Sequence, residues 1–155
     1  MLDSGTKKKL DEQFQSGDSR AAIYLDTIIR TLGINYNEYR FIKLLSNNPE
    51  GIEPSVIAEK LSLQRQMVTY IINGLEKKGY LSRDLHPTDK RRILLTLTAE
   101  GKTILQSCVD LVNRYHEKMS EYIPEDVIRD YIRIRETISE GREKAVQELL
   151  REIEK

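Results

Sequence analysis

The sequence of 155 residues is short of cysteine, of long apolar runs and of net charge. Its single cysteine, Cys108, excludes a framework of internal disulfides and favours a reducing compartment, so we expect a cytoplasmic protein. No apolar run approaches the roughly 20 residues that a membrane span requires. The lysines of Met1–Lys9 are followed by no apolar stretch, so we also expect no signal peptide and no membrane partner.

Residues that build metal sites and catalytic centres are also scarce. His86 and His116 lie thirty residues apart, and there is no second cysteine to complete a metal site. No glycine-rich loop has the pattern of a phosphate cradle. The carboxylates are scattered along expected helix faces, where a solvated or ion-paired surface is the simplest interpretation. We therefore expect no enzyme, no cofactor and no metal.

The charge is balanced overall but unevenly distributed. There are 25 basic and 25 acidic residues, which argues against a nonspecific polycation. Between Arg65 and Arg92, seven residues are basic and three are acidic, whereas eleven acidic and eight basic residues follow from Glu117 onward. A neutral chain with one basic region is what a site-directed phosphate binder needs.

The most informative stretch is 64–78, which we interpret as a DNA recognition helix. Val68, Ile71 or Ile72, and Leu75 recur at helical spacing and form one apolar stripe. Polar residues occupy the remaining face, and the forked donors and acceptors of Arg, Gln and Asn match base edges in the major groove. A solvated amphipathic helix without a partner would show the same pattern. The candidate DNA contacts are Gln64, Arg65, Gln66, Thr69, Tyr70, Asn73 and Lys77.

Helix start and stop signals predict two helices in the first third of the chain. Asp18 or Ser19 can cap the first of them, which should end near Gly33 because glycine tolerates the left-handed conformation after a helix. Asn35 and Glu38 have the spacing of a capping box and predict the start of a second, shorter helix.

A helix-turn-helix and a β-hairpin follow. Pro54 suits the first position of a two-turn helix, which a short turn joins to the stretch 64–78. After Gly79 the pattern becomes strand-like, and an expected turn at 86–89 precedes the alternating run 93–97, so we expect a hairpin wing. The candidate DNA contacts in the wing are Arg83, Asp89, Lys90, Arg91 and Arg92.

These segments resemble the MarR family of winged helix-turn-helix transcription regulators. The matching segments, in family order, are IAEKL at 57–61, LEKKGYLSR at 75–83, DKR at 89–91 and LTAEG at 97–101. The resemblance implies a mainly α fold: a winged helix-turn-helix with a small β-hairpin wing and N- and C-terminal dimerisation helices. We expect a single MarR-type domain over 1–155, with the winged lobe at 36–98 and the dimerisation helices at 7–33 and 99–155.

Two residues depart from the family pattern. Glu53 stands where the family usually has a polar uncharged helix cap. Gly74 lies inside the recognition helix, where glycine costs about 1 kcal/mol relative to alanine. It either permits a close backbone approach or marks local softness.

The resemblance also places an arginine of the wing tip in the DNA minor groove, and the matching residue is Arg91. A narrow groove concentrates negative potential, which an inserted guanidinium can read without contacting a particular base. Asp89 either holds Arg91 in this direction by a hydrogen bond or merely stabilises the turn. In the second case Lys90, Arg91 and Arg92 would supply only diffuse charge.

Two long helices with apolar stripes are expected beyond the wing, one capped by Thr98 and one following Pro124. A chain of this size cannot cover both stripes by itself, so a second copy should cover them. The resemblance likewise implies a homodimer that presents two recognition helices to a pseudo-palindromic operator.

The resemblance further implies a repressor that responds to a small-molecule effector bound between the dimer helices and the winged lobe. Candidate ligand-binding residues are Tyr24, Tyr36, Tyr39, Tyr115 and Met119, although aromatic residues at helical spacing also form ordinary cores. Cys108 is either a redox-sensing thiol or a buried, inert one. The alternative function is a winged-helix module that binds a protein, and steep salt dependence would favour double-stranded DNA as the partner.

Overall fold

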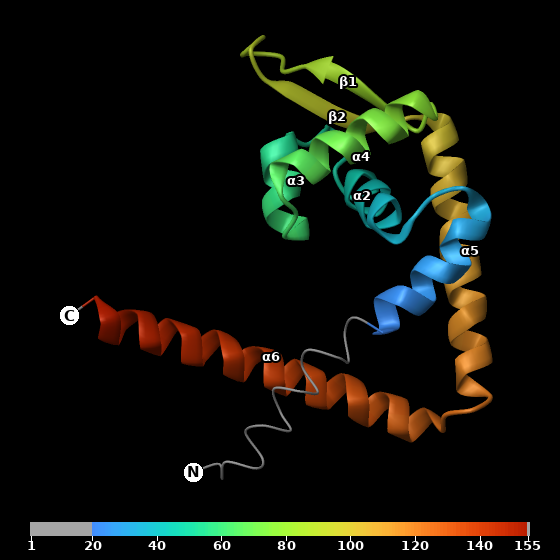
Figure 1. The fold of residues 1–155 in the computed structure, drawn as a ribbon, viewed down its shortest axis with the longest axis vertical. Helices are drawn as coiled ribbons and strands as arrows, with labels where there is room; N and C mark the ends of the chain where they lie inside the picture. Colours follow the sequence, from blue (N-terminus) through green and yellow to red (C-terminus); the bar gives the residue numbers. More distant parts are fainter. Residues whose placement is uncertain (1–19, 155) are drawn as a thin grey trace. The chain divides into compact units, whose positions relative to one another are not determined.

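The computed structural model describes residues 20–154, and its mainly α fold has the expected order of helices and strands (Figure 1). Residues 20–29 are helical and continue into the short 3-10 helix η1. The expected cap at Asp18 or Ser19 and residues 7–19 of the N-terminal segment lie outside the described residues. The elements are η1 (Arg30–Leu32), α2 (Tyr36–Ser46), α3 (Pro54–Leu61), α4 (Arg65–Lys77), β1 (Leu81–Leu85), β2 (Ile93–Leu97), α5 (Ala99–Ser120) and α6 (Glu125–Ile153).

The first two helical segments end and begin as their sequence signals predicted. Gly33 adopts a left-handed conformation with φ of 79° and closes η1. At the start of α2, the Asn35 side chain accepts a hydrogen bond from the Glu38 amide at 2.9 Å, and the Asn35 amide donates to the Glu38 carboxylate at 2.8 Å. This reciprocal pair confirms the capping box.

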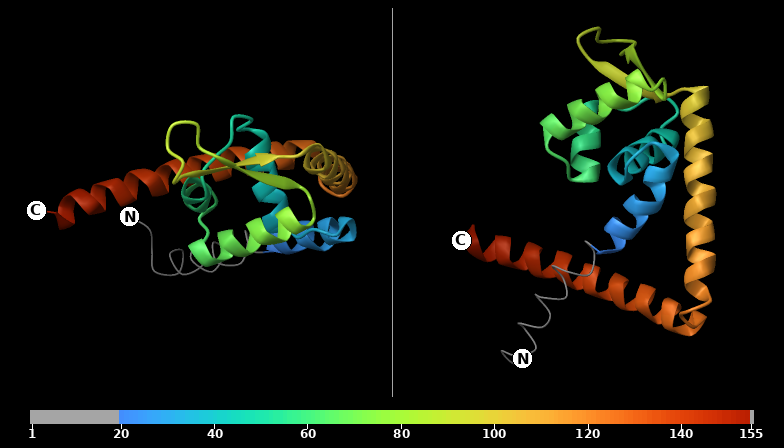
Figure 2. Two further views of the ribbon diagram at one scale, coloured as in Figure 1. Left: turned by 90° about the horizontal axis from the view of Figure 1, so that it is seen from above. Right: turned by 45° about the vertical axis from the view of Figure 1, so that its right-hand side comes forward.

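The helix-turn-helix is also confirmed, with α3 and α4 packed beside each other and beside α2 (Figure 2). Pro54 occupies the start of α3, where its missing N–H leaves no acceptor unsatisfied. Ser62 makes the turn in a left-handed conformation with φ of 53°. The recognition helix α4 ends one residue before its cap, Lys78, and Gly79 follows with φ of 75°.

The wing is a two-stranded antiparallel hairpin in which Leu81 pairs with Leu97 and Leu85 with Ile93. Ile52, which precedes α3, adds a further bridge to the middle of β2. Its amide donates to the Leu95 carbonyl at 3.2 Å and its carbonyl accepts from the Leu95 amide at 3.0 Å. This bridge ties the wing to the chain just before α3.

A single apolar core holds these elements together. Val68, Ile71, Ile72 and Leu75 of α4 are all buried, so both isoleucines belong to the predicted stripe. Cys108 of α5 is fully buried in the same cluster, which supports the buried thiol rather than an accessible redox sensor. The other buried apolar residues are Ile29, Ile34, Tyr39, Phe41, Ile42, Leu45, Ile52, Ile57, Leu81 and Leu95.

The chain divides into two compact units, one ending at Asn113 and the other beginning at Arg114. In the second unit, α6 buries none of its residues within the chain. Several of its large apolar side chains are more than half exposed: Val127, Tyr131, Ile132, Ile134, Val146, Leu149, Leu150 and Ile153. Within residues 20–154, no helix is both long and apolar enough to cross a membrane.

Candidate nucleic-acid interface

The exposed face of α4 begins at its N-terminal end. Four polar residues are exposed there: Gln64, Arg65, Gln66 and Thr69. The buried apolar stripe on the opposite face packs the helix against the core. The Thr69 hydroxyl donates to the Arg65 carbonyl at 3.1 Å, whereas among the described residues no hydrogen bond ties down the side chains of Arg65 or Gln66. These two side chains are therefore free to make bidentate hydrogen bonds to base edges in the major groove.

Farther along the helix, Asn73 is joined to the wing. An Arg83 guanidinium nitrogen, from β1, donates to the Asn73 side-chain oxygen at 2.6 Å and lies 2.7 Å from a carboxylate oxygen of Glu76. The sequence predicted Asn73 and Arg83 as separate DNA contacts, and the structure brings them together. This pairing occupies the acceptor of Asn73 and compensates part of the charge of Arg83. Lys77 remains exposed in the last turn of α4.

At the wing tip, Asp89 organises the backbone and one arginine side chain. Its Oδ1 accepts hydrogen bonds from the Arg91 amide at 3.1 Å and from Arg91 Nε at 3.3 Å, and its carbonyl accepts from the Arg92 amide at 2.9 Å. The predicted Asp89–Arg91 hydrogen bond is confirmed, and Asp89 stabilises the turn as well. Arg91 nevertheless keeps 92% of its side chain exposed, and Lys90 is exposed beside it.

Arg92, by contrast, points back toward the start of α3. Its guanidinium donates to and forms an ion pair with the Glu53 carboxylate. The hydrogen bond from Arg92 is the main reason that the pKa of Glu53 is lowered. Glu53 makes no side-chain cap on α3, so its departure from the family pattern is explained by a contact with the wing. A DNA contact by Arg92 stays a prediction, and it requires this pair to open.

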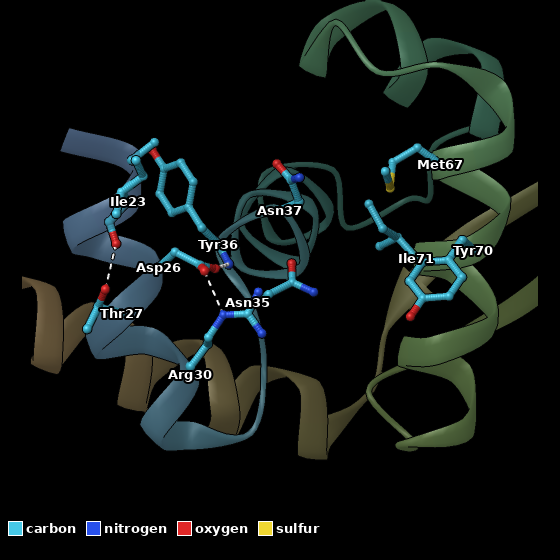
Figure 3. Close-up of a pocket in the computed structure, with 11 residues that line it drawn as sticks. Ile23, Asp26, Thr27, Arg30, Asn35, Tyr36, Asn37, Met67, Tyr70 and Ile71 are labelled. Atoms are coloured by element: carbon cyan, nitrogen blue, oxygen red, sulfur yellow. Dashed lines mark hydrogen bonds and ion pairs between the residues drawn. The ribbon is translucent and has the colours of Figure 1, made fainter. Parts of the chain in front are cut away.

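An open cavity of about 740 Å³ lies between the first helical segment, the start of α2 and one side of α4 (Figure 3). Asp26 organises one wall, accepting from the Tyr36 amide at 2.7 Å and from Arg30 Nε at 2.6 Å. The amide hydrogen bond and, to a smaller degree, Arg30 lower the pKa of Asp26 against the opposing effect of burial. The lining residues are Ala22, Ile23, Asp26, Thr27, Arg30, Asn35, Tyr36, Asn37, Met67, Tyr70 and Ile71.

Of the five predicted ligand-binding residues, only Tyr36 lines this cavity. Tyr39 is buried in the core, where desolvation raises its pKa, and its burial favours the interpretation as a core residue. Tyr24 is 57% exposed and lies outside the lining. Tyr115 and Met119 belong to the second compact unit, which begins at Arg114.

The recognition helix supplies the cavity's other wall, which the sequence reasoning missed. Met67, Tyr70 and Ile71 lie on that side of α4 (Figure 3). Tyr70 lines this cavity and is 73% exposed, so its expected contact with DNA stays a prediction. The available signal was the helical spacing of Met67 and Tyr70, which places both side chains on one face, away from Arg65 and Thr69.

Comparison with known proteins identifies the family. Residues 34–93 match the family model described as MarR family. The HTH-type transcriptional regulator FarR of Neisseria gonorrhoeae is 32% identical over 130 residues, an alignment that covers 83% of this chain and 77% of that protein. The chain belongs to the MarR family. It spans about half the length of several other curated relatives, which are matched over 45% to 57% of their own sequence.

Solved MarR-family structures share the fold of this chain. A mutant of MarR from Escherichia coli, complexed with operator DNA, has a TM-score of 0.74 at 20% identity, covering 88% of this chain and 99% of that one. CouR from Rhodococcus jostii RHA1, bound to p-coumaroyl-CoA, has a TM-score of 0.71 at 19% identity, covering 88% of this chain and 95% of that one. The winged helix-turn-helix fold expected from the sequence is confirmed.

Proposed function

We propose that this MarR-family chain regulates transcription by binding double-stranded DNA in a sequence-specific manner. The observation that carries the proposal is the exposed N-terminal face of α4, where Arg65 and Gln66 have no hydrogen-bond partner among the described residues, on a helix whose opposite face is buried. Arg91, almost fully exposed at the wing tip, would engage a neighbouring minor groove. The operator complex of the Escherichia coli MarR mutant supports the same use of the fold.

The protein acts as a homodimer in this proposal. The exposed apolar side chains of α6 support a second copy as their cover, because burying each large one contributes about 1.5–3 kcal/mol. Two recognition helices about 34 Å apart would address successive major grooves of a pseudo-palindromic operator. Sedimentation checks the assembly, since a concentration-independent monomer that binds one half-site with full affinity would contradict it.

We further propose that the chain is a ligand-responsive repressor that works in the cytoplasm, where its single cysteine stays reduced. The cavity supports the ligand response because Met67, Tyr70 and Ile71 of the recognition helix line it directly. If α4 shifts between the DNA-bound and the free protein, a ligand that contacts these side chains binds the two states with different affinity. Such differential contact is the requirement for coupling between two sites.

The deciding experiment selects tight-binding duplexes from a random pool and measures affinity for them over a range of salt concentrations. We expect one enriched sequence with two-fold symmetry and a steep loss of affinity with salt, as counterion release requires. Arg65→Ala should lose roughly 1–3 kcal/mol on the selected duplex and less on random DNA. The alternative, a protein-binding module whose basic tip meets an acidic surface, predicts no enriched sequence.

A further inference from the structure

Glu38 is the one charged residue that the described part of the chain buries, with 6% of its surface exposed. It lies in the first turn of α2, where its carboxylate completes the capping box with the Asn35 amide. A neutral glutamine can also complete a capping box. A carboxylate is favourable at a helix N-terminus, but burying its charge is costly without a cationic partner, so the cap alone does not account for a buried charge at this position.

The partner of Glu38 is Lys78, the residue that follows the last turn of α4. Lys78 Nζ lies 2.8 Å from Oε1 and 3.0 Å from Oε2 of Glu38, and it donates a further hydrogen bond to the Gly33 carbonyl at 3.0 Å. One ammonium group thus joins the end of the recognition helix to α2 and to the turn that precedes it. The first turn of α2 also borders the cavity, through Tyr36 and Asn37.

Gly74, one helical turn before Lys78, faces the same carboxylate. A Cβ added at Gly74 would lie 3.4 Å from Glu38 Oε1, which is ordinary contact, so alanine fits without displacing its neighbour. A larger side chain would compete with the carboxylate for this space. No backbone from another element of the described residues lies within 4 Å of that Cβ, so position 74 calls for a small side chain beside the Glu38 carboxylate and not for a close approach of two backbones.

We propose that Glu38 is a positioning residue for DNA recognition, which fixes the C-terminal end of α4 through Lys78 and requires a small residue at position 74. The inference rests on the proposed DNA-binding function. Because α4 has 13 residues, its length is about 20 Å, and a tilt of roughly 3° at one end moves the other by about 1 Å. Hydrogen bonds to base edges span a range of only about 0.5 Å, so such a tilt weakens base reading.

The test compares Lys78→Met with Lys77→Met, which removes the same charge from the neighbouring position. Affinity is measured for a duplex selected by the wild-type protein and for a scrambled duplex. We expect Lys77→Met to weaken both equally, because a phosphate contact carries no sequence information. Lys78→Met should lower the ratio of the two affinities roughly tenfold, as for one lost bidentate base contact. Lys78→Arg should restore most of that ratio.

Two further measurements separate positioning from general stability. Thermal unfolding of Glu38→Gln, Lys78→Met and the double variant should be non-additive, because the double variant removes the buried charge together with its partner. Gly74→Ala should keep the wild-type affinity ratio, whereas the branched Gly74→Val should lower it as Lys78→Met does.

The outcomes distinguish the two levels of the proposal. A folded Lys78→Met protein with the wild-type affinity ratio, or additive unfolding effects in the double variant, overturns the positioning role alone. A wild-type protein that selects no sequence overturns the proposed function and the positioning role that rests on it.

Discussion

Breaking the ion pair between Glu53 and Arg92 should make the protein a stronger binder of DNA of any sequence. In the unbound chain the Arg92 guanidinium is held by the Glu53 carboxylate at the start of α3. Glu53→Gln removes the negative charge and releases Arg92 from its partner. Both changes favour phosphate contact, because the local charge rises by one and the freed cation has no competing partner.

The size of the effect follows from counterion release. Each phosphate that a protein neutralises steepens the dependence of log K on log salt by about 0.9. One freed arginine in each protomer of a dimer should therefore steepen the slope by about 1.8. Fluorescence anisotropy with a random duplex, over roughly 50 to 200 mM salt, covers the range in which this difference is large.

Glu59→Gln is the matched control, because Glu59 lies exposed on α3 and forms no side-chain ion pair among the described residues. It makes the same charge change without releasing Arg92. The double variant Glu53→Gln/Arg92→Gln should return to the wild-type slope. Equal slopes for Glu53→Gln and Glu59→Gln would refute the reasoning, since they would mean that Arg92 reaches no phosphate when it is free.

The same pair predicts a pH dependence of stability. Hydrogen bonding from Arg92 lowers the pKa of Glu53 below its ordinary value of 4.5. The contribution of the pair to stability is therefore complete above pH 4.5 and is lost as the pH falls through the lowered pKa. Glu53→Gln should lack this part of the acid-induced loss when unfolding is followed against pH, and an identical acid profile in both proteins would contradict the assignment.

Three further outcomes are expected. Arg91→Lys should lose most of the DNA affinity that Arg91→Ala loses, because lysine lacks the guanidinium Nε that donates to Asp89. Asp89→Ala should also bind DNA more weakly, because it removes the acceptor that holds Arg91. Wild-type affinity of both Arg91→Lys and Asp89→Ala in DNA titrations would mean that the wing tip contributes only diffuse positive charge. Gly101→Ala should destabilise the fold by about 1–3 kcal/mol or more in denaturant unfolding, since its Cβ would lie 2.0 Å from the Tyr80 carbonyl oxygen; unchanged stability would contradict this close approach. Burial raises the pKa of Cys108 to about 11, so a thiol reagent at mildly alkaline pH should modify it only after unfolding, and rapid modification of the native protein would show an accessible thiol.

Much of the fold could be predicted from the sequence because its signals act over a few residues. Asn35 and Glu38 form their capping box within one helical turn, and Gly79 adopts the left-handed conformation directly after Lys78, the cap of α4. The stripe from Val68 to Leu75 is likewise a property of one helix, since helical spacing alone decides which side chains share a face. The wing-tip contact between Asp89 and Arg91 spans only two residues and was also predictable.

Tertiary structure alone decided which distant charges meet. Glu38 and Lys78 are 40 residues apart and Glu53 and Arg92 are 39 apart, and each has nearer residues of opposite charge that it does not pair with. Partner choice depends on which helix ends and turns the packing of the core brings within about 3 Å. The cavity is a tertiary feature for the same reason, because its walls come from segments that are adjacent only after α4 has packed against α2. Composition and spacing therefore determined that α4 is an amphipathic helix with a polar face, while packing determined which of its polar residues remain free to recognise anything.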